Sequence, residues 1–159
     1  MFGKKKKNAV VIASPLDGDV VAVSQLSDPV FRDDVLGRGI AIKPSSGNVL
    51  APANATISLM FNTGHAVSLI TDDGVELLIH IGIDTVKLKG QHFKIHKNNN
   101  DQVKAGDLLI EFDVSSIIDD GYDVSTPIVI CNPDEYKNIS FAAQGPIKAG
   151  EPLVTLTPQ

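Results

Sequence analysis

Short runs of apolar, often β-branched residues recur along the chain, separated by turns rich in Gly, Pro, Asn and Asp. Runs of this length and composition are typical of β-strands. The pattern predicts strands over residues 9–13, 19–24, 39–43, 56–61, 66–70, 75–81, 108–112, 127–130 and 152–156. Many short strands joined by regular turns indicate an all-β sandwich or barrel.

Helical periodicity is scarce. One helix is predicted over residues 113–120, where Asp113 is a candidate N-cap and Val114, Ile117 and Ile118 form one apolar stripe. A short helical turn is predicted over residues 133–136, and residues 98–101 are predicted to form a loop tip.

Two segments are echoed within the chain. Residues 13–21 resemble residues 50–58, and residues 103–109 resemble residues 147–153. In each pair a turn residue precedes an outgoing strand. The echoes favour two interlocked copies of one β-motif, and chance similarity between strand starts is the alternative.

The length of 159 residues fits one domain, predicted over residues 9–159, after a flexible lysine-rich terminus over residues 1–8. The net charge is −5 and no basic stripe with interleaved aromatics occurs, which argues against nucleic-acid binding. The apolar runs are shorter than the ~18 residues of a membrane span, so stable membrane insertion is not expected. We find no secretory signal and expect a cytoplasmic location.

The single cysteine, Cys131, excludes an internal disulfide and a cysteine-rich metal site. It follows an apolar run and has no neighbouring base in the sequence. We therefore predict a small buried hydrophobic residue rather than a nucleophile. His92 and His96 lie among polar residues and are predicted to be exposed.

The candidate chemistry is a pair of histidines, His65 and His80, on two predicted strands with the turn signal of residues 71–74 between them. A hairpin would let the two imidazoles face each other. Thr63 and His65 would share a strand face and so would His80 and Asp84, because alternate residues of a strand point the same way. The Thr63 hydroxyl could hold His65, a backbone carbonyl near Gly82 could fix the tautomer of His80, and Asp84 could attract a basic partner.

A pair of imidazoles in an apolar wall suits a metal ion, a proton relay or a transferred phosphoryl group. Two histidines satisfied within the structure are the alternative without chemistry. Zinc hydrolysis needs three protein ligands, and the His-x-His pattern of lysostaphin-type endopeptidases is absent. No phosphate-binding glycine-rich loop and no Gly-x-Ser-x-Gly elbow occurs either.

Residues 75–86 (VELLIHIGIDTV) resemble the active-site signature of the glucose-type enzyme IIA of the bacterial phosphoenolpyruvate-dependent sugar phosphotransferase system. Further motifs are similar and occur in the same order: GIAIKP at 39–44, NTGHA at 62–66, KLKG at 87–90, VKAGD at 103–107 and IEFD at 110–113. The resemblance extends over residues 9–157. It implies an antiparallel β-sandwich of the duplicated hybrid motif type, with a few short helical turns.

The resemblance also implies a function. His80 would be the phosphorylated residue, accepting phosphate from the phosphocarrier protein HPr and passing it to a cysteine of an enzyme IIB domain. His65 would donate hydrogen bonds to the phosphoryl oxygens, and Thr63 would orient His65. Sugar choice would reside in the other components of the permease.

The resemblance places the partner-binding surface around the two histidines. Asp28 and Asp84 would meet arginines of HPr or IIB, and an apolar ring would dock the partners: Val30, Phe31, Val35, Leu36, Phe61 and Leu78. No cofactor would be required. His65 and His80 could still bind zinc if a partner supplied a carboxylate, and a regulatory module whose surface charge changes on phosphorylation is an overlapping alternative.

Overall fold

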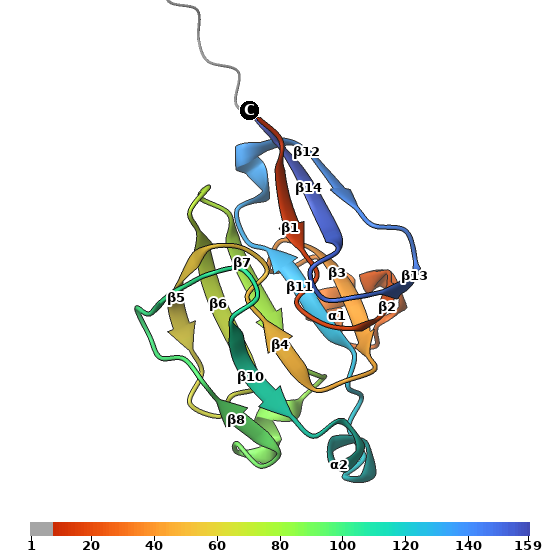
Figure 1. The fold of residues 1–159 in the computed structure, drawn as a ribbon. Coiled ribbons are helices and arrows are strands. Elements are labelled where there is room, and N and C mark those ends of the chain that lie inside the picture. Colours follow the sequence, from red (N-terminus) through yellow and green to blue (C-terminus); the bar gives the residue numbers. More distant parts are fainter. Residues whose placement is uncertain (1–7) are drawn as a thin grey trace, which may run out of the picture.

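The computed structural model describes residues 8–159, and its strands form three antiparallel sheets (Figure 1). The predicted all-β sandwich is confirmed. Most of the predicted lysine-rich terminus, residues 1–7, lies outside the described residues. The first and last strands, β1 and β14, pair side by side, so both ends of the fold lie together.

The largest sheet has eight strands in the order β13-β2-β3-β11-β7-β6-β5-β9. In that order the strands are Gly145–Ile147, Gly18–Val21, Arg38–Pro44, Thr126–Ile130, Glu76–His80, Ala66–Thr71, Ala55–Met60 and Gln102–Val103. The central pair, β11 and β7, thus carries the predicted histidine strand into the middle of the sheet.

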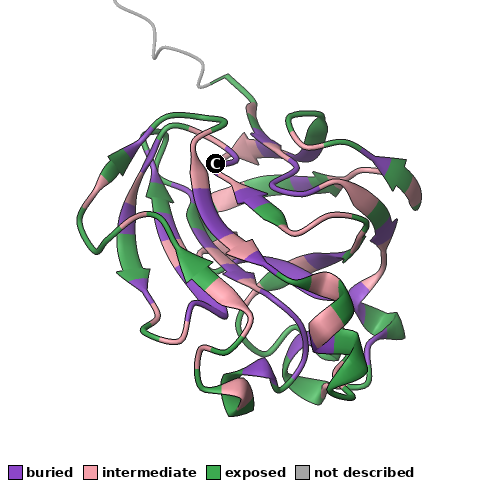
Figure 2. Cartoon of the chain, turned by 60° about the horizontal axis from the view of Figure 1, so that its bottom comes forward, coloured by how far each residue is buried: buried purple, intermediate pink, exposed green. Residues whose placement is uncertain are grey.

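Two smaller sheets form the other layer, in the orders β1-β14-β12 and β4-β10-β8. Their strands are β1 (Val10–Ala13), β14 (Pro152–Pro158), β12 (Tyr136–Phe141), β4 (Asn48–Leu50), β10 (Leu108–Phe112) and β8 (Phe93–Ile95). The main core joins the layers, and in Figure 2 many of the buried positions lie on strands. Its members include Ile57, Leu69, Ile79 and Ile128 of the large sheet and Ile12, Val49, Ile110 and Leu156 of the small ones.

The echoed segments are two copies of one motif. The amide of Ala13 donates to the Pro52 carbonyl (3.0 Å), and that of Leu50 donates to the Pro15 carbonyl (2.9 Å), so the two turns bond reciprocally. The second pair of echoed segments makes matching hydrogen bonds. The Lys148 amide donates to Glu151 Oε1 as the Lys104 amide donates to Asp107 Oδ2. The Ala149 amide donates to Asp17 Oδ1 as the Ala105 amide donates to Asn54 Oδ1. The sheet orders match as well, since β13-β2-β3-β11 mirrors β9-β5-β6-β7.

Helices are few and short. The predicted helix is present as α2 (Val114–Asp119), capped by the Asp113 side chain, although Ile118 is 52% exposed and lies outside the buried stripe. The predicted turn near residue 133 is the 3-10 helix η3 (Pro133–Glu135). The sequence pattern did not predict α1 (Pro29–Arg32) or the 3-10 helix η2 (Thr85–Leu88), and η1 (Val23–Gln25) replaces the end of the strand predicted over 19–24.

Alternation along β7 decides where His80 points. Leu77 and Ile79 are buried in the main core, whereas Leu78 and His80 face the opposite side of the sheet. A second, smaller cluster lies on that outer side, built from Val23, Leu26, Phe31, Ala41, Ile83 and Val129 with Leu78 packed against it. His80 therefore lies on the outer face of the sheet, at the margin of this cluster.

The predicted burial of Cys131 was wrong. The residue is exposed, because it follows the last residue of β11, where the chain leaves the sheet. Its sulfur atom is nevertheless partly buried, and this desolvation, together with the charge of Glu76, raises the pKa of the thiol. Within residues 8–159, none of the helices has the length and apolar character that a membrane crossing would need.

Candidate functional site

The predicted hairpin is confirmed, and it brings the two histidines together. Strands β6 and β7 pair with Ala66 opposite His80, and the Ile81 amide donates to the His65 carbonyl at 2.7 Å. The two imidazole centroids are 5.1 Å apart with the rings nearly perpendicular, at 81°. His65 is buried, at 5% exposure, while His80 is only half-buried. The ring open to a reactant is therefore that of His80.

A backbone carbonyl fixes the tautomer of His80. Its Nδ1 lies 2.7 Å from the carbonyl oxygen of Gly82. A carbonyl oxygen only accepts, so Nδ1 must carry the hydrogen, and Nε2 is left with a free lone pair in the neutral ring. Gly82 has φ of +76°, a left-handed conformation that side chains disfavour. The predicted role for a carbonyl near Gly82 is thus confirmed by the geometry.

The Thr63 hydroxyl is hydrogen-bonded to His65 Nδ1. The reason differs from the predicted one, because β6 begins only at Ala66 and Thr63 lies in the preceding turn. That turn is closed by the Gly64 amide, which donates to the Phe61 carbonyl at 2.8 Å. A tight turn, rather than strand alternation, places the hydroxyl beside the ring.

Burial lowers the pKa of both imidazoles. For His65 it lowers the pKa to about 4, and the neighbouring His80 adds to the shift. For His80 burial again lowers the pKa, opposed by the Gly82 hydrogen bond and by the charges of Asp28 and Asp84. Both rings are therefore expected to be mainly neutral near pH 7.

The two predicted acidic residues lie at the edges of the site. Asp28 caps α1 by accepting from the Val30 amide at 2.9 Å. Asp84 does not continue the strand as predicted, because β7 ends at His80 and Asp84 adopts a left-handed conformation with φ of +60°. Its carboxylate is exposed and lies 4.0 Å from the Lys87 ammonium. Both carboxylates still act electrostatically on His80.

The predicted apolar ring divides into two groups. Phe31 is 6% exposed and its ring centroid lies 4.9 Å from that of His80, and the Phe61 centroid lies 5.3 Å from that of His65. Together with the half-buried Leu78, these residues form the wall of the site. Val30, Val35 and Leu36 are 39%, 66% and 44% exposed and lie in or just after α1.

The other two histidines contact carboxylates elsewhere in the fold. His92 Nε2 lies 2.7 Å from an Asp120 carboxylate oxygen, and His96 Nε2 lies 2.9 Å from one of Glu111. His96 is exposed as predicted, but His92 is half-buried, contrary to the prediction.

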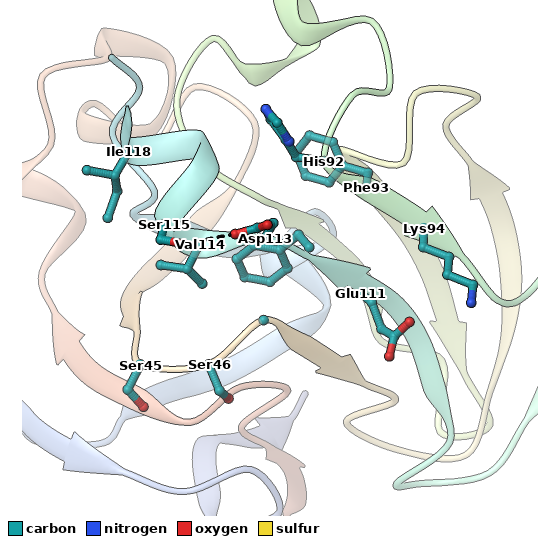
Figure 3. A pocket seen from close by; sticks show the side chains of 12 residues that line it. Ser45, Ser46, His92, Phe93, Lys94, Glu111, Asp113, Val114, Ser115 and Ile118 are labelled. Carbon is teal, nitrogen blue, oxygen red and sulfur yellow. Dashed lines mark hydrogen bonds between the residues drawn. The ribbon is translucent and has the colours of Figure 1, made fainter. Parts of the chain in front are cut away.

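His92 also borders a cavity of about 790 Å³ between β8, β10, α2 and the β3–β4 turn. Figure 3 shows its lining, with Ser45 and Ser46 across from His92 and a hydrogen bond between Ser115 and Asp113. None of the predicted site residues lines this cavity. The histidine pair instead lies on the face of the large sheet.

In the part of the chain that the structure describes, no third metal-ligating side chain joins the pair. Among residues 8–159, no group of three or more His, Cys, Asp or Glu side chains is arranged to hold a metal ion.

Two contacts of the site were not predicted from the sequence. The hydroxyl of Thr85 donates to the Ile81 carbonyl, and the Ile83 amide donates to the Asp123 carbonyl at 2.9 Å. Both hold the turn that carries Gly82.

The chain is similar to known proteins over most of its length. Residues 10–136 match the family model for the phosphoenolpyruvate-dependent sugar phosphotransferase system, EIIA 1. The PTS system glucose-specific EIIA component of Buchnera aphidicola subsp. Acyrthosiphon pisum is 45% identical over 153 residues, which cover 96% of this chain and 92% of that protein. The PTS system beta-glucoside-specific EIIBCA component of Dickeya chrysanthemi is 45% identical over 143 residues, 90% of this chain but 23% of that protein.

A solved structure shows the same fold. The glucose permease IIA from Mycoplasma capricolum superposes with a TM-score of 0.88 at 32% identity, covering 94% of this chain and 96% of that one. The chain thus spans about a quarter of the EIIBCA relative and nearly all of the two EIIA proteins. It belongs to the EIIA 1 family of the phosphoenolpyruvate-dependent sugar phosphotransferase system.

Proposed function

We propose that the chain is a phosphohistidine carrier of this system, in which His80 accepts a phosphoryl group from phospho-HPr and passes it to a cysteine of enzyme IIB. One observation carries the proposal. His80 donates from Nδ1 to the Gly82 carbonyl, which leaves the Nε2 lone pair free on a half-buried ring beside a second imidazole.

The transfer needs only displacement at phosphorus. The His80 Nε2 lone pair attacks the phosphorus of phospho-HPr, a new N–P bond forms, and the bond to the donor nitrogen breaks with its electron pair returning to that nitrogen. In the second step a thiolate of IIB attacks and the Nε2–P bond breaks. The hydrogen stays on His80 Nδ1 throughout, donated to the Gly82 carbonyl, so His80 takes up no proton from either partner.

His65 would stabilise the transferring group. If the Thr63 hydroxyl donates to His65 Nδ1, the hydrogen of this ring is on Nε2, where it can donate to a phosphoryl oxygen. Phosphoryl transfer depends mainly on positioning and on stabilising charge at the equatorial oxygens. A donor fixed in advance does this without reorganisation.

The low pKa of His65, about 4, fits a relay. A permanently charged group beside the phosphoryl oxygens would stabilise the phosphorylated state and hinder onward transfer. A neutral imidazole donates a hydrogen bond but adds no full positive charge. The phosphoryl group would therefore remain transferable at neutral pH.

The surface around His80 suits basic partners with an apolar centre. Asp28 and Asp84 offer carboxylates for arginines, and the exposed Val30, Val35 and Leu36 offer apolar contacts. The EIIBCA relative, whose name includes both IIB and IIA, supports IIB as the acceptor. We place the carrier in the cytoplasm, where an exposed free thiol such as Cys131 stays reduced.

No cofactor is part of this proposal. Zinc binding at a partner interface remains a separate proposal, because His65 and His80 supply two ligands while a zinc site takes three or four. A carboxylate from the partner would have to complete it.

Phosphorylation of histidine variants tests the proposal. The chain is incubated with phosphoenolpyruvate, enzyme I and HPr, and acid-labile phosphate is measured by intact mass. His80→Ala should take up none, and His65→Ala should take up phosphate but transfer it poorly to IIB. His96→Ala, which changes an exposed histidine outside the site, is the control and should behave like the wild type. Uptake by His80→Ala at the wild-type level would reject the proposal.

A further inference from the structure

The turn that follows His80 is held at several successive peptide groups. The Ile81 amide donates to the His65 carbonyl, and the Ile81 carbonyl accepts from the hydroxyl of Thr85. Gly82 and Asp84, on either side of Ile83, both have left-handed backbones, with φ of +76° and +60°. Such a turn is not a regular extension of β7, so specific contacts must maintain it.

The peptide group between Gly82 and Ile83 is bonded at both of its ends. Its carbonyl accepts from His80 Nδ1 at 2.7 Å, and its amide donates to the Asp123 carbonyl at 2.9 Å. Hydrogen bonds in such a chain polarise one another. The direction in which this one peptide points therefore determines which nitrogen of His80 keeps its hydrogen.

The Thr85 side chain bonds the neighbouring peptide group, between Ile81 and Gly82. It is fully buried, at 0% exposure, and its hydroxyl supplies the hydrogen bond to the equally buried Ile81 carbonyl. Its methyl group packs against Gly82, since a Cβ added at Gly82 would lie 2.5 Å from Thr85 Cγ2. Thr85 thus contacts the turn both before and at the residue whose carbonyl bonds His80.

We propose that Thr85 is a positioning residue for phosphoryl transfer, which keeps the Gly82 carbonyl aimed at His80 Nδ1 and so keeps His80 Nε2 free to attack. Thr85 does not touch the phosphoryl group and acts only through the turn of residues 81–85. This role rests on the proposed function, in which the phosphoryl group is carried on His80 Nε2.

The geometry predicts what removal of the hydroxyl does. Without it the buried Ile81 carbonyl loses its partner, and a buried carbonyl left unpaired is costly. The turn then relaxes toward another partner, and the Gly82 carbonyl moves away from His80 Nδ1. The ring is released to the other tautomer, in which Nε2 carries the hydrogen and cannot attack.

Two variants at Thr85 and one matched control test the role. Thr85→Val keeps the shape but removes the hydroxyl, and Thr85→Ser keeps the hydroxyl. Thr71→Val is the control, because Thr71 is another buried threonine, 4% exposed, whose hydroxyl bonds the Val75 amide at the far end of the same hairpin. Circular dichroism and unfolding curves establish that each variant is folded.

The first readout is the tautomer of His80, measured by ¹⁵N NMR of the imidazole in the unphosphorylated protein. Thr85→Val should show an increased share of the Nε2–H form and faster exchange of the Nδ1 hydrogen. Thr85→Ser and Thr71→Val should keep the wild-type spectrum. The second readout is the rate of phosphoryl uptake from phospho-HPr, expected to fall about 10- to 100-fold in Thr85→Val, as for a reacting group displaced by about 1 Å.

A folded Thr85→Val protein with the wild-type tautomer and uptake rate would overturn the proposal. An equal change of tautomer in Thr71→Val would overturn it as well, since the effect would then be general loss of stability. The NMR measurement needs no phosphoryl donor. Its failure therefore counts against Thr85 alone, whereas a wild-type chain that takes no phosphate on His80 counts against the proposed function.

Discussion

Replacing Gly82 by alanine tests the local geometry of the site most severely. The added Cβ would lie 2.5 Å from Thr85 Cγ2 and 2.9 Å from the Asp123 carbonyl oxygen. It would also place a side chain on a backbone with φ of +76°. The turn must therefore move, and the carbonyl that moves with it is the partner of His80 Nδ1.

The size of the effect follows from two contributions. A left-handed conformation costs a non-glycine residue about 1–2 kcal/mol. Overpacking in a buried, well-filled site adds about 1–3 kcal/mol. Gly82→Ala should therefore lower the free energy of unfolding by roughly 2–5 kcal/mol.

Gly106→Ala separates the two contributions. Gly106 has φ of +93°, but nothing lies within 4 Å of an added Cβ there. This variant should lose only the conformational part, about 1–2 kcal/mol. Urea unfolding of both variants isolates the crowding as a difference of about 1–3 kcal/mol.

Phosphoryl uptake completes the comparison. Gly82→Ala should accept phosphate from phospho-HPr much more slowly than the wild type, and Gly106→Ala should accept it at the wild-type rate. If the two variants were equally stable and equally active, the described contacts around Gly82 would be wrong.

Three further predictions concern the neighbouring groups. Thr63→Ala should slow phosphoryl transfer from the chain to IIB by about 5- to 30-fold, the equivalent of one hydrogen bond of about 1–2 kcal/mol, and Thr63→Ser should restore the rate. Rapid-quench measurement of the transfer tests this prediction, and an unchanged rate in Thr63→Ala would contradict it. The pKa of His65 is about 6.5 in the unfolded chain and about 4 in the folded chain. The unfolded state therefore binds more protons between these values, and the free energy of unfolding should fall as the pH decreases from about 6.5 to about 4. Urea unfolding across this range should show a weaker dependence of that free energy on pH for His65→Gln than for the wild type, and an unchanged dependence would refute the assigned pKa. Asp120→Asn removes the carboxylate that contacts His92 and should lower the free energy of unfolding by less than about 1 kcal/mol, measured by urea unfolding. It should leave phosphoryl uptake unchanged, whereas a large loss of uptake would link the cavity beside His92 to the reaction.

The histidine hairpin could be predicted because its signals are local. A turn lies between two alternating apolar runs, and the register then follows, with Ala66 opposite His80. The duplicated motif was also visible, since each copy repeats its own turn residues. The resemblance of residues 75–86 to the enzyme IIA signature pointed to His80 and to the role of His65.

Other features left no periodic signal. Helix α1 is a single turn started by Asp28 and Pro29, too short for a helical repeat, and β9 has only two residues. His92 is half-buried and pairs with Asp120, which is 28 residues away in the chain. Thr85 bonds a backbone carbonyl four residues earlier, across a left-handed turn that no alternation predicts. These contacts depend on the folded chain and not on neighbouring residue types.

The central claim is that His80 reacts through Nε2, because Nδ1 is committed to the Gly82 carbonyl. The most direct test is ¹⁵N and ³¹P NMR of the wild-type chain after phosphorylation by phospho-HPr, which identifies the nitrogen bonded to phosphorus. We predict a single phosphoryl group on Nε2 of His80, with the Nδ1 hydrogen still protected from exchange. A phosphoryl group on Nδ1 of His80, or on any other side chain, would contradict the account.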